Sequence, residues 1–520
     1  MNHLFSRLLR SLHHWWWLAL LLLLLLYWQL PIQGTVILSP MALDVNPQWP
    51  QIILDPLTPQ PGDEVTVTVV DNTPWTHVRL MVNDIPAIFD TAQTLPGSVS
   101  WQWSWHFIMP HAADTTSSAS ATGNTGAILK FYRDCATGCR LRGQRLLQPL
   151  IEAQQGLPKP SGPPTKLCVD FPDPQRDWRG RSGWVVDLTY AQLAGDGVDR
   201  YWSVDELVQR VGQMADNGLR LLVRVDYAKA QSLPPTDDAL ALTTYLTYLR
   251  RLARDDRLRP VYGYIIGSGY NTAAANAQAA AKPVTPVWYA RLFNGAGEAV
   301  DHTDNVVETV RAENPQVRLL VGPVRPWQSD QDGTQPYRIN APWLNYMNTL
   351  VAALDVGAQA KAAAGIPLAA PDGFAVNAAG NPLAPELGDR DPVDEPLVDL
   401  PRAEWHGAQA GFRVYRDWLA IVNSYPTTQG LPLYITATNT YATGAQPDTA
   451  DPNTLLPAQN YPKGWLTNAL TTINQEPQVH ALCWFLDLIP GDNTWNAFSL
   501  ARQPGRLVDA AAEFEDLLTR

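Results

Sequence analysis

The sequence lacks most of the features that mark nucleotide, nucleic-acid or metal chemistry. Its 520 residues carry 38 Lys and Arg against 50 Asp and Glu, a formal net charge of −12, whereas nucleic-acid binding requires clustered cations that displace counterions from phosphates. No Walker A loop, no HExxH motif and no Cys and His residues at zinc-binding spacing occur in it. We therefore expect no nucleic-acid partner, no cofactor and no metal site.

Charged residues are also scarce near the N-terminus, where one long apolar run stands out. Arg7 and Arg10 precede residues 15–32, which are mostly Leu and Trp, and the next Lys or Arg is Arg79. At about 1.5 Å per residue, a helix over this run nearly spans a hydrocarbon core of about 30 Å. Because cations favour the cytoplasmic side, the run predicts a single-pass anchor that leaves residues 1–14 in the cytoplasm.

A cleaved signal peptide is the alternative interpretation of this run. Residues 29–34 match the small-residue cleavage pattern poorly, so we favour the uncleaved anchor. The protein is then expected at the cell membrane, with a spacer over residues 33–47 and the bulk of the chain extracytoplasmic.

Residues 48–150 alternate between apolar and polar side chains, as half-buried antiparallel strands do. In residues 99–107, Val, Trp and Phe on one face alternate with Ser, Gln and His on the other. The pattern predicts an immunoglobulin-like β-sandwich. The row of Trp side chains in residues 99–107 fits either a buried core or a platform for a sugar.

After a Pro- and Gly-rich linker at residues 151–165, short apolar runs alternate with helical stretches. This order is typical of a (β/α)8 barrel, which we predict over residues 166–520. Its eight strands are expected, in chain order, at residues 167–171, 183–189, 219–226, 263–267, 317–322, 373–377, from 433 onward and at 479–487. Helices are expected from residue 203 and at residues 237–254, 287–314 and 408–423.

Two insertions interrupt this order. Residues 272–286 are rich in Ala, and residues 352–404 include an acidic, Pro-rich segment. We interpret the acidic segment as a solvated loop near the barrel mouth, with calcium binding or relocated catalysis as the alternatives.

The chain has only four cysteines, and they suit an oxidising exterior. Cys135 and Cys139 lie between two strand-like runs, so a disulfide at the tip of a hairpin is the favoured interpretation. Cys168 and Cys483 fall on the first and last predicted barrel strands, which are neighbours in a closed barrel. A second disulfide and two buried thiols are both compatible with that position.

Two predicted strands run into loops with informative patterns. Residues 266–271 read Ile-Gly-Ser-Gly-Tyr-Asn, and residues 435–437 read Ile-Thr-Ala. They resemble the Ile-Gly-Asn-Glu-Pro-Asn and Ile-Thr-Glu patterns that follow the fourth and seventh strands of the (β/α)8 glycoside hydrolases. The resemblance covers about residues 166–515 and implies a barrel of the retaining, cellulase- or β-xylosidase-like type.

Gly269 and Ala437 stand where this resemblance places the acid/base and nucleophile glutamates. Retaining hydrolysis requires two carboxyl groups about 5 Å apart, one to protonate the leaving oxygen and one to attack the anomeric carbon. Gly and Ala can do neither, so no catalytic residue is expected at these two positions.

The resemblance also suggests residues that can hold a glycan without cleaving it. Ser268 replaces an Asn that contacts the sugar, and Trp484 resembles the Trp at the floor of the sugar site, although either Trp484 or Trp327 can instead fill packing space. The predicted ligand-binding residues are Ser268, Asn271, Trp327, Asn377, Thr436 and Trp484.

Three further carboxylates, Asp187, Asp226 and Asp487, lie near predicted strand ends and are the fallback acids. A strand-end Asp in a barrel often caps a helix or pairs with an Arg instead. The leading hypothesis is a membrane-anchored, extracytoplasmic pseudo-glycosidase that binds a glycan or supports the cell envelope. An active glycoside hydrolase with relocated carboxylates and a structural subunit of a membrane complex are the alternatives.

The anchor prediction is tested on protein recovered from membranes. N-terminal sequencing is expected to begin at or near Met1, and deletion of residues 1–32 is expected to release the protein from the membrane fraction, because it removes the one long apolar run. A mature N-terminus near residue 35 would contradict the anchor.

Overall fold

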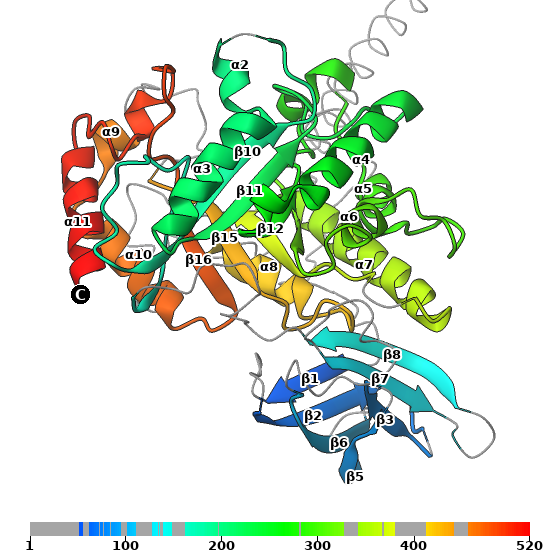
Figure 1. Cartoon of the computed structure of the whole chain (residues 1–520). Coiled ribbons are helices and arrows are strands. Elements are labelled where there is room, and N and C mark those ends of the chain that lie inside the picture. Colours follow the sequence, from blue (N-terminus) through cyan, green and yellow to red (C-terminus); the bar gives the residue numbers. More distant parts are fainter. Residues whose placement is uncertain are drawn as a thin grey trace, which may run out of the picture. The chain divides into compact units, whose positions relative to one another are not determined.

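The computed structural model describes most of the chain beyond residue 50 (Figure 1). The described residues are 51–55, 62–94, 101–110, 127–147, 162–326, 342–379, 412–440 and 456–520, apart from 72, 76, 84, 134, 136–138, 196, 280, 281, 367 and 368. The predicted anchor, residues 15–32, lies outside these ranges. Within them, no helix combines the length and the apolar character that a membrane crossing requires.

The region before the barrel forms two antiparallel sheets of four strands each. One sheet has the order β1 (Gln51–Asp55), β2 (Glu64–Asp71), β6 (Trp101–Ile108) and β5 (Ile88–Thr94). The other has the order β4 (Ile85–Pro86), β3 (Arg79–Val82), β7 (Ala127–Arg133) and β8 (Arg140–Leu147). The predicted hairpin around the first two cysteines is therefore β7–β8.

The two sheets share one apolar core. Trp103 and Trp105 of β6 are buried, and both rings contact Phe131 of β7, at centroid distances of 6.0 and 5.8 Å. Alternation along β6 thus places these two Trp side chains in the core, so they do not form a sugar platform.

The rest of the described chain builds a closed barrel of eight parallel strands. Their order follows the sequence, and β16 closes the ring against β9. The strands are β9 (Pro164–Asp170), β10 (Ser182–Tyr190), β11 (Arg220–Asp226), β12 (Val261–Ile266), β13 (Arg318–Val321), β14 (Gly373–Asn377), β15 (Leu433–Thr438) and β16 (Val479–Trp484). All of them coincide with predicted strands, with ends that differ by a few residues.

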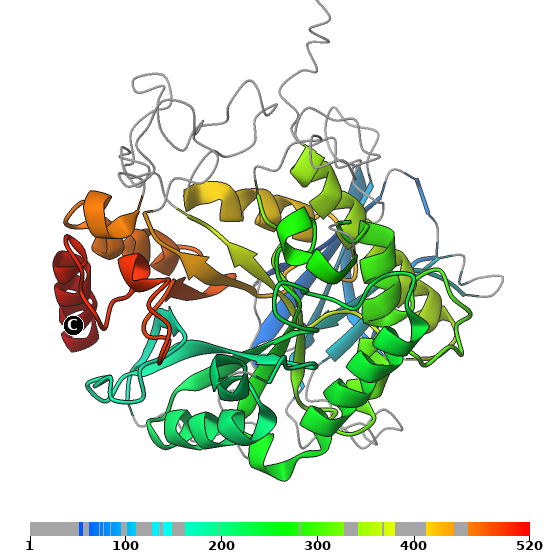
Figure 2. The ribbon, with the colours of Figure 1, turned by 90° about the horizontal axis from the view of Figure 1, so that it is seen from above.

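Helices lie on the outside of these strands (Figures 1 and 2). They are α2 (Gly197–Tyr201), α3 (Val204–Asp216), α4 (Ala239–Arg254), α5 (Pro286–Asn294), α6 (Val306–Arg311), α7 (Pro342–Ala363), α8 (Tyr415–Val422), α9 (Pro457–Asn460), α10 (Trp465–Asn474) and α11 (Leu507–Thr519). Figure 2 views the barrel from above, with α11 at its left edge.

One helix prediction and one predicted insertion boundary are wrong. The single helix expected at residues 287–314 is two helices, because α5 stops at Gly295, whose φ of 73° is left-handed, and Asn305 caps the start of α6. The insertion expected from residue 352 begins inside α7, whose Ala-rich second half favours a helix. The acidic segment that follows lies outside the described residues.

The barrel interior is filled by side chains and is not a pore. Trp184, Tyr262 and Tyr434 project into it from three strands, with Trp184 edge-to-face against the two Tyr rings at 4.9 and 5.3 Å. All three are almost fully buried. Such a layer of bulky side chains is how small parallel barrels pack their centre.

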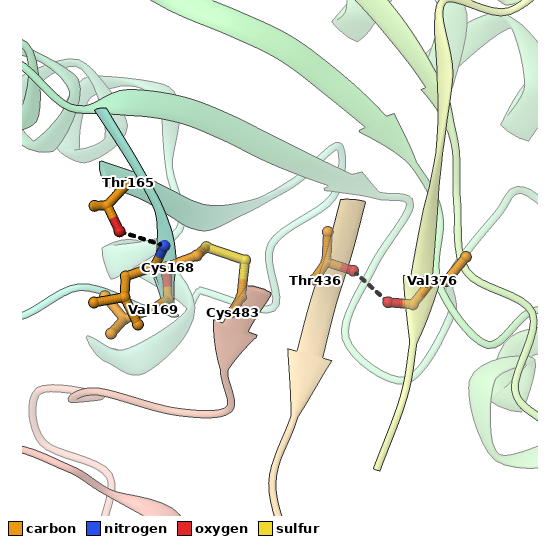
Figure 3. Close-up of a disulfide and its surroundings, with 7 residues drawn as sticks. Thr165, Cys168, Val169, Val376, Thr436 and Cys483 are labelled. Carbon is orange, nitrogen blue, oxygen red and sulfur yellow. Dashed lines mark hydrogen bonds between the residues drawn. A yellow bond between two sulfur atoms is a disulfide. The ribbon is translucent and has the colours of Figure 1, made fainter. Parts of the chain in front are cut away.

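Two disulfides are present. Cys135 and Cys139 are bonded at the β7–β8 hairpin, and Cys168 of β9 is bonded to Cys483 of β16 (Figure 3). The second bond joins the first and last barrel strands across the closing ladder, where the two residues face each other.

Replacing both Cys168 and Cys483 by Ala is expected to destabilise the barrel by about 2–5 kcal/mol, because that bond restrains a long loop in the unfolded chain. The two cysteines are separated by 315 residues. The matched control is the double replacement Cys135→Ala and Cys139→Ala, whose bond spans a separation of 4 residues. Urea midpoints of the barrel transition measure both, and an equal shift in the control would contradict the expectation.

Candidate functional site

A cavity of about 680 Å³, which we call the mouth cavity, opens at the carboxyl ends of the barrel strands. It takes residues from the ends of β10, β11, β14 and β15 and from the loops after β12 and β16. Loops at this end of a (β/α)8 barrel form the substrate sites of barrel enzymes. The mouth cavity is therefore the candidate functional site.

Gly269 and Ala437 both line the mouth cavity. Gly269 has a left-handed φ of 63°, which favours Gly, and its N–H donates to the carbonyl oxygen of Pro323. A Cβ at Gly269 would meet nothing closer than Ala275, at 3.9 Å. The local backbone, not lack of space, therefore disfavours a side chain at this position.

Other predicted residues also reach the cavity. Ser268 lines it and is held in place by a 2.6 Å hydrogen bond from its main-chain N–H to the hydroxyl of Ser232. Asn377 lines it from the end of β14, where its backbone is paired with that of Ala437 on β15. The structure thus brings Ser268, Gly269, Asn377 and Ala437 into one wall.

Two residues that were predicted to contact a glycan are instead buried and hydrogen-bonded to the backbone of neighbouring segments. The side chain of Asn271 accepts from the N–H of Arg325 and donates to its carbonyl oxygen, at 2.8 and 2.9 Å. The hydroxyl of Thr436 donates to the carbonyl oxygen of Val376 at 3.4 Å (Figure 3). Neither side chain lines the mouth cavity, because each is used to join neighbouring strands or loops.

Trp484, which was predicted to form the floor of the sugar site, does not line the mouth cavity either. Trp484 is completely buried, and its indole N–H donates to the carbonyl oxygen of Phe498 at 2.9 Å. Its ring is enclosed by Tyr461 and Trp465, which explains why it cannot reach a ligand in the cavity. Trp327 lies outside the described residues.

Trp495, which the sequence patterns did not indicate, is the exposed aromatic residue of the cavity. It lies in the loop after β16, is 42% exposed and packs edge-to-face on Phe485 at 5.7 Å. The sequence patterns missed Trp495 because loops lack the periodicity that reveals buried faces. The one signal for a site residue here was the presence of a Trp shortly after the last strand.

Two of the fallback acids form buried ion pairs with Arg side chains. Asp187 binds the guanidinium of Arg210 with contacts of 2.7 and 3.1 Å. Asp487 binds that of Arg176, with a contact of 2.8 Å to its Nε. All four charged groups are nearly inaccessible, so the interpretation as structural ion pairs holds for both acids.

Asp226 differs, because it lines the mouth cavity. Its Oδ2 lies 3.3 Å from Nε of Arg224, while its Oδ1 is buried without a hydrogen-bond partner among the described residues. Burial raises the pKa of Asp226 to about 6, although Arg224 opposes the shift. Asp226 is the single carboxylate among the described lining residues.

Asp170, at the end of β9, belongs to the same charge cluster and was missed by the sequence reasoning. Burial raises its pKa to about 8, with Arg224 opposing and Asp187 and Asp226 adding to the shift. Asp170 does not line the cavity. Two carboxyl groups therefore share the one guanidinium of Arg224.

The chemistry available in the mouth cavity is polar and aromatic. Amide, hydroxyl and guanidinium groups are combined with exposed aromatic and aliphatic surface, a mixture typical of small-molecule sites. Within the described ranges, no group of three or more His, Cys, Asp or Glu is arranged to hold a metal ion.

No protein-family model and no curated protein matches the chain. Among solved structures, it is similar to a family 39 glycoside hydrolase from Bacteroides cellulosilyticus WH2, with 12% identity over 90% of this chain and 83% of that one and a TM-score of 0.38. A glucosidase from Croceicoccus marinus shows 14% identity over 61% and 56%, with a TM-score of 0.36. An endocellulase from Pyrococcus horikoshii shows 10% over 75% and 96%, with a TM-score of 0.33.

Similarities of this size carry no argument about activity. The barrel assignment rests on the closed ring of eight parallel strands in this chain. A barrel fold does not by itself imply a function, which depends on the residues of the site.

Asp170→Asn is expected to stabilise the fold, and the gain should grow as the pH rises from 4 to 8. The folded-state pKa of about 8 lies above the ordinary value of 3.8, so the folded chain retains a proton that the unfolded chain releases, and stability falls with rising pH in this range. The neutral amide removes this cost of ionising or protonating Asp170, which is on the order of 4 kcal/mol at pH 7.

Asp487→Asn makes the same chemical change in a buried ion pair and is the matched control. It should destabilise by about 3–5 kcal/mol, because Arg176 then loses its fully buried partner and keeps only the half-exposed Glu515, at 3.1 Å. Urea midpoints at several pH values compare the two variants. Destabilisation by Asp170→Asn, independent of pH, would refute the assignment of a protonated Asp170.

Proposed function

We propose that the barrel binds a glycan in the mouth cavity without hydrolysing it. Hydrolysis by retaining or inverting glycosidases requires two carboxyl groups that flank the scissile bond. Among the described lining residues the only carboxylate is Asp226, and Gly269 and Ala437 offer no acid. This single-carboxylate wall is the observation that carries the proposal.

The rest of the wall suits a neutral sugar. Ser268 and Asn377 offer hydroxyl and amide groups that can bond sugar hydroxyls, and the exposed ring of Trp495 offers a flat apolar surface for a pyranose. The cavity volume of about 680 Å³ falls within the usual size range of small-molecule sites.

We also propose that residues 15–32 anchor the protein at the cell membrane, with the barrel extracytoplasmic. The charge asymmetry and length of that run support this, and the two disulfides suit an oxidising compartment. The sandwich is proposed to be immunoglobulin-like, because sheets ordered β1-β2-β6-β5 and β4-β3-β7-β8 correspond to the A-B-E-D and C′-C-F-G orders.

Hydrolysis by a relocated acid is the second candidate, and one observation favours it. Asp226 lines the cavity, has an unpartnered Oδ1 and has a pKa raised to about 6, which suits general acid–base catalysis near neutral pH. The missing element is a second carboxyl group among the described residues that line the cavity.

Binding is tested with the full-length protein on a glycan array, followed by calorimetry with any glycan that binds. Trp495→Ala is expected to weaken binding at least about tenfold, because it removes the largest exposed apolar contact of the cavity. The matched control, Phe89→Ala, truncates an exposed aromatic side chain on β5 of the sandwich and should leave affinity unchanged.

Turnover of aryl glycosides separates the two candidates. No turnover is expected from the unmodified protein. Turnover that is lost in Asp226→Asn would establish hydrolysis and overturn the proposal, and a glycan array without any binder would remove glycan binding altogether.

A further inference from the structure

A second cavity, of about 610 Å³, lies at the N-terminal ends of β9, β10, β11 and β16, beside α10 and α11. We call it the basal cavity. It shares no lining residue with the mouth cavity, and the aromatic layer of the barrel interior separates the two ends of the strands. The proposed glycan site therefore makes no use of it.

The basal cavity is strongly cationic. Its described lining residues include four Lys or Arg side chains and no Asp or Glu. These four come from the starts of β9 and β11, the residue before β10 and the residue after α11: Lys166, Arg220, Arg181 and Arg520.

Two of these cations are held in place by uncharged groups. Nζ of Lys166 donates to the carbonyl oxygens of Ile473 and Glu476, at 2.8 Å each. Nε of Arg181 donates to the carbonyl oxygen of Leu518 at 3.2 Å. Carbonyl oxygens orient the two cations but do not neutralise their charge.

The other two cations have different surroundings. The guanidinium of Arg220 lies 5.1 Å from the ring centroid of Trp184, within the range of a cation–π contact. Arg520 pairs with Asp516 one turn earlier on α11. Both members of that pair are exposed, so the pair contributes little to stability.

Burial and mutual repulsion already disturb the groups that can titrate here. Burial lowers the pKa of Lys166 to about 8, although the Glu476 carboxylate opposes the shift. Burial lowers the pKa of His480 to about 3, and Lys166, Arg318 and Arg220 add to that shift. Nδ1 of His480 is buried without a hydrogen-bond partner in the described part of the chain.

We propose that the basal cavity binds a small molecule that carries a phosphate group. Four Lys and Arg side chains line this cavity, and none of its described lining residues is Asp or Glu. Such a lining favours an anion, and guanidinium groups match the oxygens of a phosphate. The cavity is much larger than inorganic phosphate, and Leu470 and Leu517 give it an apolar side. The ligand is therefore a phosphate ester with an apolar or sugar-sized body.

Calorimetry on the full-length protein with inorganic phosphate and pyrophosphate tests the charge recognition. Pyrophosphate is expected to bind more tightly, and raised salt should weaken both. Lys166→Met and Arg520→Gln should each weaken pyrophosphate at least about tenfold, since each removes a charged hydrogen-bond donor. Arg520 is 62% exposed, so its variant is expected to fold even if the Lys166 variant does not.

Arg254→Gln is the matched control, because Arg254 is an exposed Arg on α4 that pairs with Glu313. It changes the net charge equally and should leave binding unchanged. Affinity for pyrophosphate should fall as the pH rises from 7 to 9, because Lys166 then loses its proton. No detectable binding of either anion, or an equal loss in Arg254→Gln, would overturn the proposal.

Two arms distinguish the sources of the phosphate group. Vesicles of phosphatidylglycerol, compared with phosphatidylcholine, report a lipid headgroup, and glycerol 1-phosphate reports a soluble ester. In either arm the Arg520→Gln variant should bind more weakly than Arg254→Gln, and binding that ignores both substitutions would count against the basal cavity.

Discussion

Closure of the barrel between β16 and β9 is the constraint on which both cavities depend. The ladder and the disulfide between Cys168 and Cys483 hold the first and last strands together although they lie far apart in the chain. Because side chains alternate along a strand, a closed ring forces them into shared layers. On β9 this places Lys166 at the base, Cys168 in the middle and Asp170 at the mouth.

The middle layer keeps two different chemistries apart. Trp184, Tyr262 and Tyr434 fill the interior between the cations of the basal cavity and the Asp170–Arg224–Asp226 cluster. The aromatic layer therefore keeps the ionisable groups of the two ends apart. The mouth presents polar and aromatic groups that suit a neutral sugar, whereas the base presents positive charge that suits a phosphate.

Strand positions could be predicted because each strand is a short apolar run with its own turn signals. The prediction failed where one residue changed the outcome, as at Gly295, which splits the helix expected over residues 287–314. The sequence patterns located part of the mouth cavity, because Ser268, Asn377 and Ala437 lie at or just after the carboxyl ends of strands, which must meet at one face of the barrel. Asp170 and Trp495 were missed, since nothing local distinguishes them from other strand-end acids and loop aromatics.

The sequence by itself determined the barrel, its strand order and the absence of acids at Gly269 and Ala437. Only the tertiary structure decided which strand-end side chains face the mouth cavity. Asp187 and Asp487 are turned into ion pairs, whereas Asp226 is left on the wall. The physical reason is that residues distant in the chain supply the Arg partners of Asp187 and Asp487. Distant residues also decide which side chains are enclosed, and local sequence patterns carry no information about either.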